Sequence, residues 1–273
     1  MKKEALGYLH GFTQEEQGRL YRQARFMEHR IHEGLPFHRA RRMLEVGCGV
    51  GAQTEILLRR YPELHVTGID AAEPNLEQAR RYLEGLPWAR GRFDLFLKNA
   101  TRLDLEVEHY DSAFLCWILE HVAEPALILS EVRRLLRPGS WVVCTEVQNA
   151  TFFLDPYAPS TLAYWTSFND HQLTLGGDPF VGAKLGNLLQ RIGYRDVTTE
   201  VRTIHLDNRA PVERAEFIAF WADLLLSGAD GLRAAGKVTE ETIDAMQHEL
   251  EEVRHNPDAV FFYSFVQARA RVP

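Results

Sequence analysis

The sequence predicts an α/β protein built around a mostly parallel sheet, and two observations support that prediction. Residues 43–51 have the pattern of a short apolar strand that ends in a glycine-rich turn, and a helix-like run follows directly. Farther along the chain, strand-like runs at residues 65–70, 92–98, 110–116 and 141–146 alternate with helix-like runs. Strands that alternate with helices pair in parallel through right-handed crossovers, which place helices on both faces of the sheet.

Composition limits the class of protein. The 273 residues suit one large domain or one domain with an inserted cap, and their composition is globular. A net charge of −7 argues against a general affinity for nucleic acid. Cys48, Cys116 and Cys144 lie in apolar runs, so we expect reduced thiols in a cytoplasmic protein. Neither a signal peptide nor a run of 18 apolar residues is visible, so we expect no membrane span.

The glycine-rich turn is the candidate ligand site. Glycines at 47, 49 and 51 permit positive φ and a close approach of the backbone to a ligand. The helix behind the turn presents free N–H groups and its positive dipole end to anionic or polar atoms. Asp70 ends the next strand, where its carboxylate can accept hydrogen bonds from both hydroxyls of a ribose.

The same turn also fits a dinucleotide-binding pattern, Gly47-x-Gly49-x-x-Ala52, which alone has low specificity. Glu45 helps to separate the two ligand classes. It stands two positions ahead of Gly47, where a dinucleotide site usually carries an apolar or small residue. An acid at this position suits a ligand with a positively charged amine and sulfonium better than a pyrophosphate.

The motif from Glu45 to Gly51 closely resembles the E/D-x-G-x-G-x-G motif of class I S-adenosylmethionine (SAM)-dependent methyltransferases. The resemblance extends over residues 42–146, through Glu120-His121-Val122 after the fourth strand and a later Leu-Arg-Pro-Gly turn. It points to the broad type-11 group, which includes ubiquinone- and menaquinone-pathway enzymes that act on small molecules. The resemblance implies a Rossmann-like, seven-stranded, mostly parallel sheet with an antiparallel last strand and helical cap insertions.

Helix signals place the remaining elements in order. Thr13 and Glu16 form a capping-box pattern, which predicts a helix from there to about His32. Pro74 near a helix start and Gly85 at its end bound a helix after Asp70. Further helices are predicted over residues 52–61, 126–137, 159–173, 181–192, 212–227 and 239–253, and further strands over residues 194–206 and 259–266.

We therefore expect a single methyltransferase domain with five parts. These are an N-terminal lid helix region (1–40), a SAM-binding core (41–146), helical cap segments (147–180 and 209–256) and the last strand (257–273). The first cap segment is rich in aromatic residues and follows the fifth strand. It should therefore cover the carboxyl edge of the sheet, where ligands of such folds bind.

The resemblance assigns SAM as cofactor and S-adenosylhomocysteine (SAH) as product. It implies that Asn99 holds the adenine amino group, that Ala100 offers a backbone N–H, and that Trp117 lies near the sulfonium or the substrate. The candidate cofactor-binding residues are Glu45, Gly47, Cys48, Gly49, Gln53, Asp70, Ala71, Asn75, Asn99, Ala100 and Trp117.

The acceptor pocket is assigned to aromatic and polar side chains of the lid and the first cap. Tyr164 and His171 share a helix face, with Trp165 one position off. The candidate pocket residues are Tyr21, Trp117, Tyr164, Trp165 and His171. Packing of the cap onto the sheet explains the same aromatic residues, and a solvated side chain explains Gln23, another possible lid contact.

The catalytic residue stays unassigned, with His121 and His171 as candidates. The Glu-His pair is common across the family whatever the substrate, which favours a structural role for His121. No cysteine or histidine spacing resembles a metal site, so no metal is expected.

The function implied is transfer of a methyl group from SAM to an O, N or C nucleophile of a small-molecule acceptor. Such chemistry needs positioning and water exclusion more than a conspicuous catalytic residue. Two alternatives stay open: an NAD(P)-dependent Rossmann oxidoreductase, and a SAM-fold protein that binds SAM without methylating. None of the five lysines has a tyrosine four residues ahead, as a short-chain oxidoreductase would require. The oligomeric state is open, and a dimer could form through the helical insertions.

Overall fold

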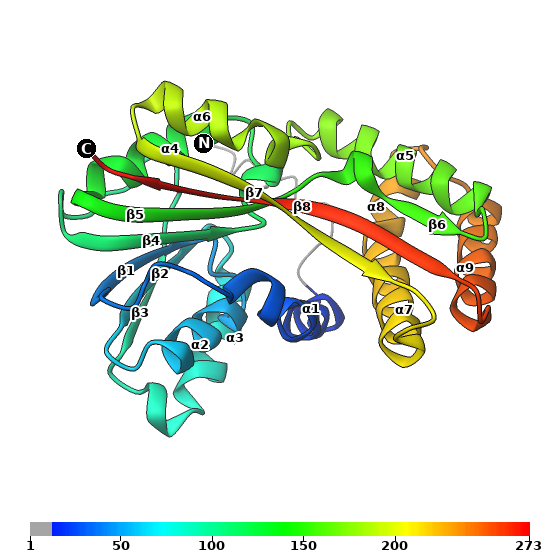
Figure 1. Ribbon diagram of the computed structural model, residues 1–273, viewed down its shortest axis with the longest axis horizontal. Helices are drawn as coiled ribbons and strands as arrows, with labels where there is room; N and C mark the ends of the chain where they lie inside the picture. The colour runs from blue at the N-terminus through cyan, green and yellow to red at the C-terminus, as the bar shows by residue number, and fades with distance from the viewer. Residues whose placement is uncertain (1–12) are drawn as a thin grey trace.

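A computed structural model describes residues 13–273 as a central sheet with helices on both faces and a helical cap at one end (Figure 1). The sheet has eight strands, in the order β3-β2-β1-β4-β5-β8-β6, and β7 pairs with β8. Five neighbouring strands pair with one another in parallel. They are β1 (Arg42–Val46), β2 (His65–Asp70), β3 (Phe93–Leu97), β4 (Tyr110–Cys116) and β5 (Leu136–Val147).

The last strand runs antiparallel to its neighbours, as predicted. β8 (Val260–Arg271) pairs along one edge with β5 and along the other with β7 (Arg195–Leu206). Because β8 extends past the end of β5, part of its edge is left over, and β6 (Phe153–Asp155) pairs with that part. The sheet therefore has one strand more than the seven that were predicted. β6 has only three residues, and its pairing depends on the overhang of β8.

Helices cover both faces of the parallel strands (Figure 1). α1 (Gln14–His32), α2 (Ala52–Arg60) and α3 (Glu73–Glu84) lie on one face, while α4 (Pro125–Leu135) and α6 (Leu185–Ile192) lie on the other. The predicted cap of α1 is present, because the Thr13 side chain accepts the Glu16 N–H at 3.2 Å. The segment predicted as one helix over residues 181–192 is instead a 3-10 turn followed by α6. The 3-10 turns are η1 (Pro87–Ala89), η2 (Leu119–His121), η3 (Asn149–Thr151) and η4 (Val181–Lys184).

The cap packs around the overhanging end of β7 and β8 (Figure 1). It contains α5 (Pro159–Thr174), α7 (Pro211–Ser227), α8 (Ala229–Ala234) and α9 (Glu240–His255). Helix α8 was not predicted, and Thr239 caps α9 by accepting the Thr242 N–H at 3.3 Å, as its sequence pattern indicates. The rings of Phe217 and Trp221 on α7 contact Phe261 on β8, which joins the cap to the sheet.

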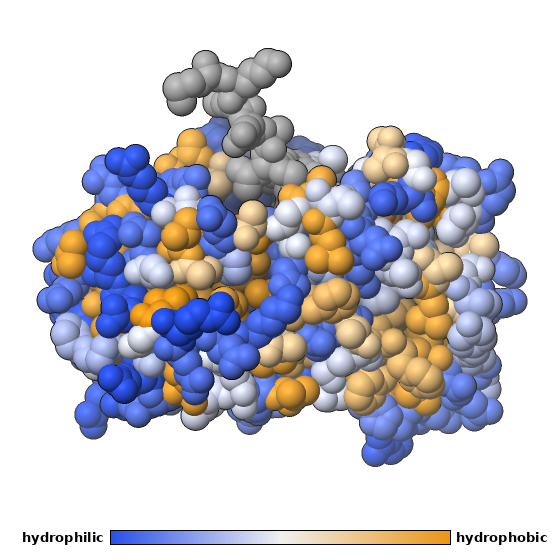
Figure 2. Space-filling model, turned by 90° about the horizontal axis from the view of Figure 1, so that it is seen from above, coloured by the Kyte–Doolittle hydropathy of each residue, from blue (hydrophilic) through white to orange (hydrophobic). Residues whose placement is uncertain are grey.

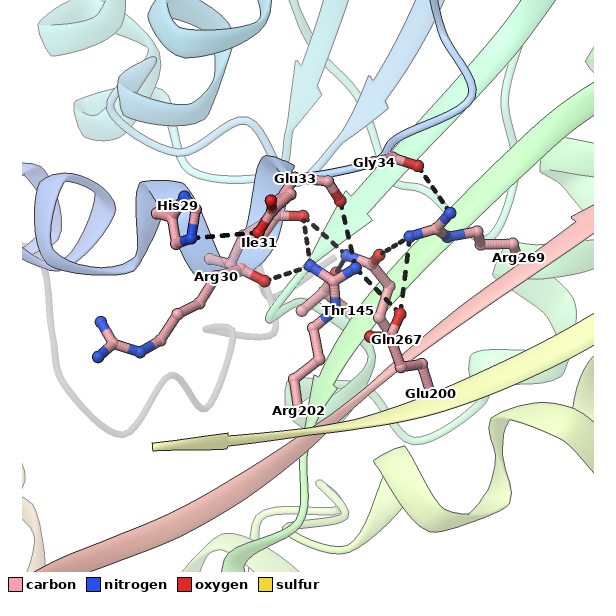
Figure 3. A network of polar contacts seen from close by, with 10 residues as sticks. All are labelled: His29, Arg30, Ile31, Glu33, Gly34, Thr145, Glu200, Arg202, Gln267 and Arg269. Carbon is pink, nitrogen blue, oxygen red and sulfur yellow. Dashed lines mark hydrogen bonds and ion pairs between the residues drawn. The ribbon is translucent and has the colours of Figure 1, made fainter. Parts of the chain in front are cut away.

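The carboxyl end of α1 is fixed to the sheet by three side chains (Figure 3). Arg202 of β7 donates to backbone carbonyls of residues 30, 31 and 33. Gln267 and Arg269 of β8 donate to the carbonyls of Ile31 and Gly34, at 2.9 and 2.7 Å. Cations at a helix C-terminus satisfy carbonyls that have no partner within the helix and complement its dipole. This anchoring fixes the carboxyl end of α1 against β7 and β8.

The surface seen from above is mainly hydrophilic, with hydrophobic residues interspersed in small groups (Figure 2). Within residues 13–273, no helix is both long and apolar enough to cross a membrane.

Candidate functional site

A cavity of about 260 Å³ lies at the carboxyl edge of the parallel strands. Two halves of the cavity wall can be distinguished by the strands from which their residues extend. The glycine-turn half is formed by the turn after β1 and by the ends of β2 and β3, with Gly47, Gly49, Asp70 and Asn99 on its wall. The aromatic half lies beyond β4, over β5, β7 and β8, and is formed by the rings of Trp165, Phe168, Phe217, Phe220, Trp221 and Tyr263.

The glycines of the turn are required by its geometry. Gly47, Gly49 and Gly51 have φ values of 73°, 53° and 79°, in the left-handed region that other residues rarely adopt. A Cβ at Gly47 would also lie 2.9 Å from the Ile118 side chain. The turn therefore packs directly against the segment that follows β4, and a larger residue at Gly47 would push the two apart.

Asp70 joins the glycine turn to the start of α3. One carboxylate oxygen accepts the Gly49 N–H and the other accepts the Ala72 N–H, both at 2.8 Å. Burial raises the pKa of Asp70, while these backbone N–H groups act to lower it. Each carboxylate oxygen has a further lone pair, and Asp70 lies on the cavity wall. The residue can therefore fix the turn and accept hydrogen bonds from a ligand at the same time.

Glu45 is placed differently from the sequence expectation. Its side chain is buried behind the turn, outside the cavity wall, and accepts the Thr54 hydroxyl of α2 at 2.6 Å. Burial raises the pKa of Glu45 to about 8, against the opposing effect of the Thr54 hydrogen bond. The group is mainly neutral at pH 7, so it presents no carboxylate charge to a cationic ligand. Its role in the structure is to tie β1 to α2.

The other cofactor candidates line the glycine-turn half. These are Cys48, Gln53, Ala71, Asn75, Asn99 and Ala100. Asn99 is exposed, and its side-chain oxygen accepts both the backbone N–H and the hydroxyl of Thr101, at 2.9 and 2.8 Å. Gln53 contacts the Nε2 of His32 at 2.6 Å, and burial lowers the pKa of His32 to about 4. His32 is therefore neutral at pH 7, and Gln53 is held in one orientation.

The turn after β4 separates the two halves of the cavity, and Glu146 holds it. Trp117 has a φ of 53°, which is unusual for a residue other than glycine and marks local strain. One carboxyl oxygen of Glu146, at the end of β5, accepts the N–H groups of Ile118 and Leu119 at 3.1 and 2.9 Å. Glu146 is fully buried, and burial together with nearby Glu120 raises its pKa to about 8, against the backbone hydrogen bonds.

The same turn is tied to the cap. The backbone carbonyl of Glu120 accepts the Asp178 N–H at 2.8 Å and the Gln172 side-chain amide at 3.2 Å. Gln172 also donates to the Glu120 carboxylate at 3.0 Å. A Cβ at Gly177 would lie 2.4 Å from the Glu120 carbonyl oxygen, so the cap loop packs directly onto the turn. The role of Glu146 in this turn was not predicted from the sequence.

His121 is the only histidine of the described residues on the cavity wall. Its Nε2 lies 3.6 Å from a carboxylate oxygen of Glu120, at the boundary between the two halves. His171, the other catalytic candidate, lies outside the wall and contacts the Thr174 hydroxyl at 3.3 Å. Within residues 13–273, no group of three or more His, Cys, Asp or Glu side chains is arranged to hold a metal ion.

The pocket candidates separate into two sets. Trp117 and Trp165 line the cavity, whereas Tyr21, Tyr164 and His171 do not. Tyr164 is fully buried, and its hydroxyl donates to the Leu225 carbonyl of α7 at 2.7 Å. The Tyr21 hydroxyl donates to the Val50 carbonyl at 2.8 Å, which links α1 to the glycine turn. Gln23 does line the cavity.

The α7 rings were absent from the sequence candidates. Phe217, Phe220 and Trp221 recur at three- and four-residue spacing, which is the signal of a single helix face. Spacing alone does not tell whether such a helix face packs in a core or lines a cavity. In this protein the face of α7 does both.

Comparison with known proteins agrees with this architecture. Residues 44–144 match a family described as "Methyltransferase domain". The ubiquinone biosynthesis O-methyltransferase of Cereibacter sphaeroides (strain ATCC 17025 / ATH 2.4.3) is 34% identical over 113 residues, which cover 41% of this chain and 42% of that protein. The matched region therefore spans less than half the length of this relative.

Solved structures share the fold at low sequence identity. Haemonchus contortus phosphoethanolamine N-methyltransferase 2, in complex with phosphomonomethylethanolamine and SAH, has a TM-score of 0.57 and 17% identity, covering 92% of this chain and 52% of that chain. The [4+2]-cyclase SpnF has a TM-score of 0.56 and 19% identity, covering 93% of this chain and 82% of that chain.

Proposed function

We propose that this protein is a class I SAM-dependent methyltransferase, which transfers a methyl group from SAM to a small-molecule acceptor. The match of residues 44–144 to a methyltransferase domain family supports this proposal. One observation carries the proposal. A single cavity joins the glycine turn and Asp70 to an aromatic half, across the turn that contains Trp117 and His121. A group-transfer enzyme needs this arrangement, because donor and acceptor must meet in one closed space.

The glycine-turn half fits the adenosyl part of SAM. The positive φ values of Gly47 and Gly49 and their lack of side chains let the backbone of the turn come close to a ligand. Asp70 would accept the ribose hydroxyls, and Asn99 and Ala100 at the end of β3 would contact the adenine. The proposal gives Glu45 no direct contact, since its carboxyl bonds to Thr54.

When bound, SAM supplies a methyl group that is already activated by a positively charged sulfur. The chain's own contribution is position and the exclusion of water. The turn fixed by Glu146 sets Trp117 at the junction of the two halves, where the acceptor atom would face the methyl group. His121 lies on the same wall and is the side chain we assign to accept a proton from an acceptor hydroxyl or amine.

The surrounding segments would enclose the reaction. Arg19, Gln23 and Met27 of α1 line the cavity, so α1 acts as a lid in this proposal, anchored at its carboxyl end. The helical caps, residues 147–180 and 209–256, would select the acceptor. The net charge of −7 favours a small molecule over nucleic acid as acceptor. Three free cysteines fit a reducing, cytoplasmic location.

A second candidate function is that the protein binds SAM without transferring its methyl group, and that the same site serves a different reaction. The fold shared with a [4+2]-cyclase, over 93% of this chain, motivates this alternative. Release of SAH separates the two functions. A panel of phenolic, amine and enolic acceptors incubated with SAM should yield SAH with at least one acceptor if the protein methylates. SAM binding without SAH release from any acceptor would favour the second candidate.

A further inference from the structure

We propose that the methyl acceptor is a neutral molecule with a flat, apolar ring system, held in the aromatic half of the cavity. This inference rests on the proposed methyl transfer and adds the chemical class of the acceptor. Its basis is the chemistry of the cavity wall beyond Trp117. That wall differs from the glycine-turn half in its number of aromatic side chains, in the hydrogen bonding of its polar groups and in its charged side chains.

The aromatic half is a preformed surface. Trp165 stacks on Phe168 with ring centroids 5.3 Å apart and planes 18° apart. Trp221 lies 5.3 Å from Trp165 and 5.0 Å from Tyr263. Phe152 stacks on Trp221 at 5.0 Å from outside the cavity and supports it from behind. Rings from α5, α7 and β8 thus fix one another, so a flat ligand would meet oriented ring faces and edges at little ordering cost.

Several polar groups of this half are engaged with one another, whereas the indole N–H groups of Trp117 and Trp221 have no partner among the described residues. The Tyr263 hydroxyl donates to the Asn149 side-chain oxygen at 2.8 Å, and the Asn149 amide donates to Asn169 at 2.7 Å. The Trp165 indole N–H donates to the Asn149 carbonyl at 3.0 Å. Apart from those two indole N–H groups, the wall therefore offers a ligand mainly carbon surface.

The charged groups of the cavity lie elsewhere or are neutralised. Asp70 and Lys98 stand at the ends of β2 and β3, in the glycine-turn half. Arg19 of α1 is nearly fully buried and bonds both carboxylate oxygens of Glu16, at 2.7 and 2.6 Å. The remaining charged side chain of the described wall is Glu120, in the turn after β4, with His121 beside it.

These charges define what the aromatic half would reject. No described residue of that half supplies a cation for a phosphate or carboxylate, and no carboxylate stands among its rings for an ammonium. Moving an unpaired charge into such a site has a large desolvation cost.

Titration calorimetry on the full chain saturated with SAH tests the proposal with four matched probes. These are 2-naphthol, decahydro-2-naphthol, 2-naphthyl phosphate and 2-(2-naphthyl)ethyl-trimethylammonium. We expect 2-naphthol to bind about two- to tenfold tighter than its saturated analogue, because ring–ring contacts add to area burial. We expect both charged probes to bind at least about a hundredfold more weakly than 2-naphthol. Tighter binding of either charged probe, or equal binding of the saturated analogue, overturns the proposal.

A charge inserted into the wall supplies a second test. Leu224 of α7 lines the cavity and is partly buried, so Leu224→Arg should gain affinity for 2-naphthyl phosphate and lose affinity for 2-naphthol. The matched control is Val212→Arg, on the same helix but 69% exposed and away from the cavity. The control should leave both affinities unchanged. Gain of phosphate binding by both variants, or by neither, contradicts the placement of the acceptor.

The experiments distinguish a failure of the proposed methyl transfer from a failure of the proposed acceptor class. If SAH itself does not bind, the proposed function is wrong. If SAH binds but the probes follow a different order, only the acceptor class is wrong.

Discussion

Glu146 is the residue whose removal should most clearly disrupt the junction between the two halves of the cavity. One of its carboxyl oxygens accepts two backbone N–H groups, those of Ile118 and Leu119, and the side chain is fully buried. Glu146→Ala leaves both donors without that acceptor. A buried donor left unpaired costs about 1–3 kcal/mol, so the two together should cost roughly 3 kcal/mol or more.

The isosteric change isolates the hydrogen-bonding role from the charge. Because the pKa of Glu146 is raised to about 8 by burial and by Glu120, the side chain is neutral at pH 6. A glutamine copies the neutral acid and keeps an oxygen for both N–H groups. At pH 6 we therefore expect Glu146→Gln to melt close to the unmodified protein, and Glu146→Ala to melt roughly 6–12 °C lower.

The assay pairs thermal unfolding at pH 6 with calorimetric titration of SAH. Glu146→Ala should also weaken SAH binding several-fold, because Ile118 packs directly on Gly47 of the glycine turn. Glu249→Ala is the matched control. Glu249 accepts the Ser160 and Thr161 N–H groups at 2.9 and 2.7 Å, away from the cavity, so its loss should lower stability without changing SAH affinity. Equal damage from Glu146→Gln and Glu146→Ala would refute the reasoning, as would an undamaged Glu146→Ala.

Three further predictions concern Asp70, the two buried carboxyl groups Glu45 and Glu146, and Tyr21. Asp70→Ala should lower SAM affinity at least about tenfold, since a hydrogen bond to a charged group is worth about 1.5–3 kcal/mol; calorimetry showing unchanged affinity would remove Asp70 from the site. Glu45 and Glu146 have folded pKa values raised to about 8, so the folded state binds more protons than the unfolded state. The two protonated carboxyl groups contribute fully to the free energy of unfolding below the pKa of the unfolded chain, and this contribution is lost as the pH rises toward 8. In urea titrations at pH 5 to 8, each group should lower the free energy of unfolding by up to about 1.4 kcal/mol per pH unit. Glu45→Gln should make the free energy of unfolding depend less steeply on pH, and an unchanged pH dependence would contradict this. Tyr21→Phe should lower the free energy of unfolding by about 0.5–1.5 kcal/mol and speed SAH release in stopped-flow experiments, because it removes the hydroxyl bond to Val50; equal release rates would show that α1 does not gate the turn.

The sequence was informative where structure is set by local pattern. Apolar alternation and glycine or proline punctuation are properties of short segments, so the strands and helices between residues 42 and 135 were predicted close to their observed bounds. The fifth strand is an exception, because β5 begins at Leu136 and includes the segment that was predicted as a turn before residue 141. The same holds for the caps of α1 and α9, in which Thr13 and Thr239 bond to residues three positions away. Gly47, Gly49 and Asp70 lie together because the carboxyl ends of parallel strands share one edge.

The rest depends on contacts between distant segments. β6 forms only because β8 overhangs β5, and three residues carry too little pattern to predict a strand. Glu45 turns toward Thr54 because α2 returns over β1, which no motif encodes. Tyr164 and Phe168 share a face of α5, yet Phe168 lines the cavity and Tyr164 is enclosed against Leu225. Helical spacing relates residues to one another but does not say which neighbour each one meets.

Titration calorimetry with SAM and with NAD tests the central claim most directly. The glycine turn, Asp70 and Asn99 line one half of a single cavity, and the account predicts that this half binds SAM in the micromolar range and does not bind NAD. Asp70→Ala, measured in the same titration, should weaken SAM binding and confirm the place of the ligand. Binding of NAD in preference to SAM would contradict the account.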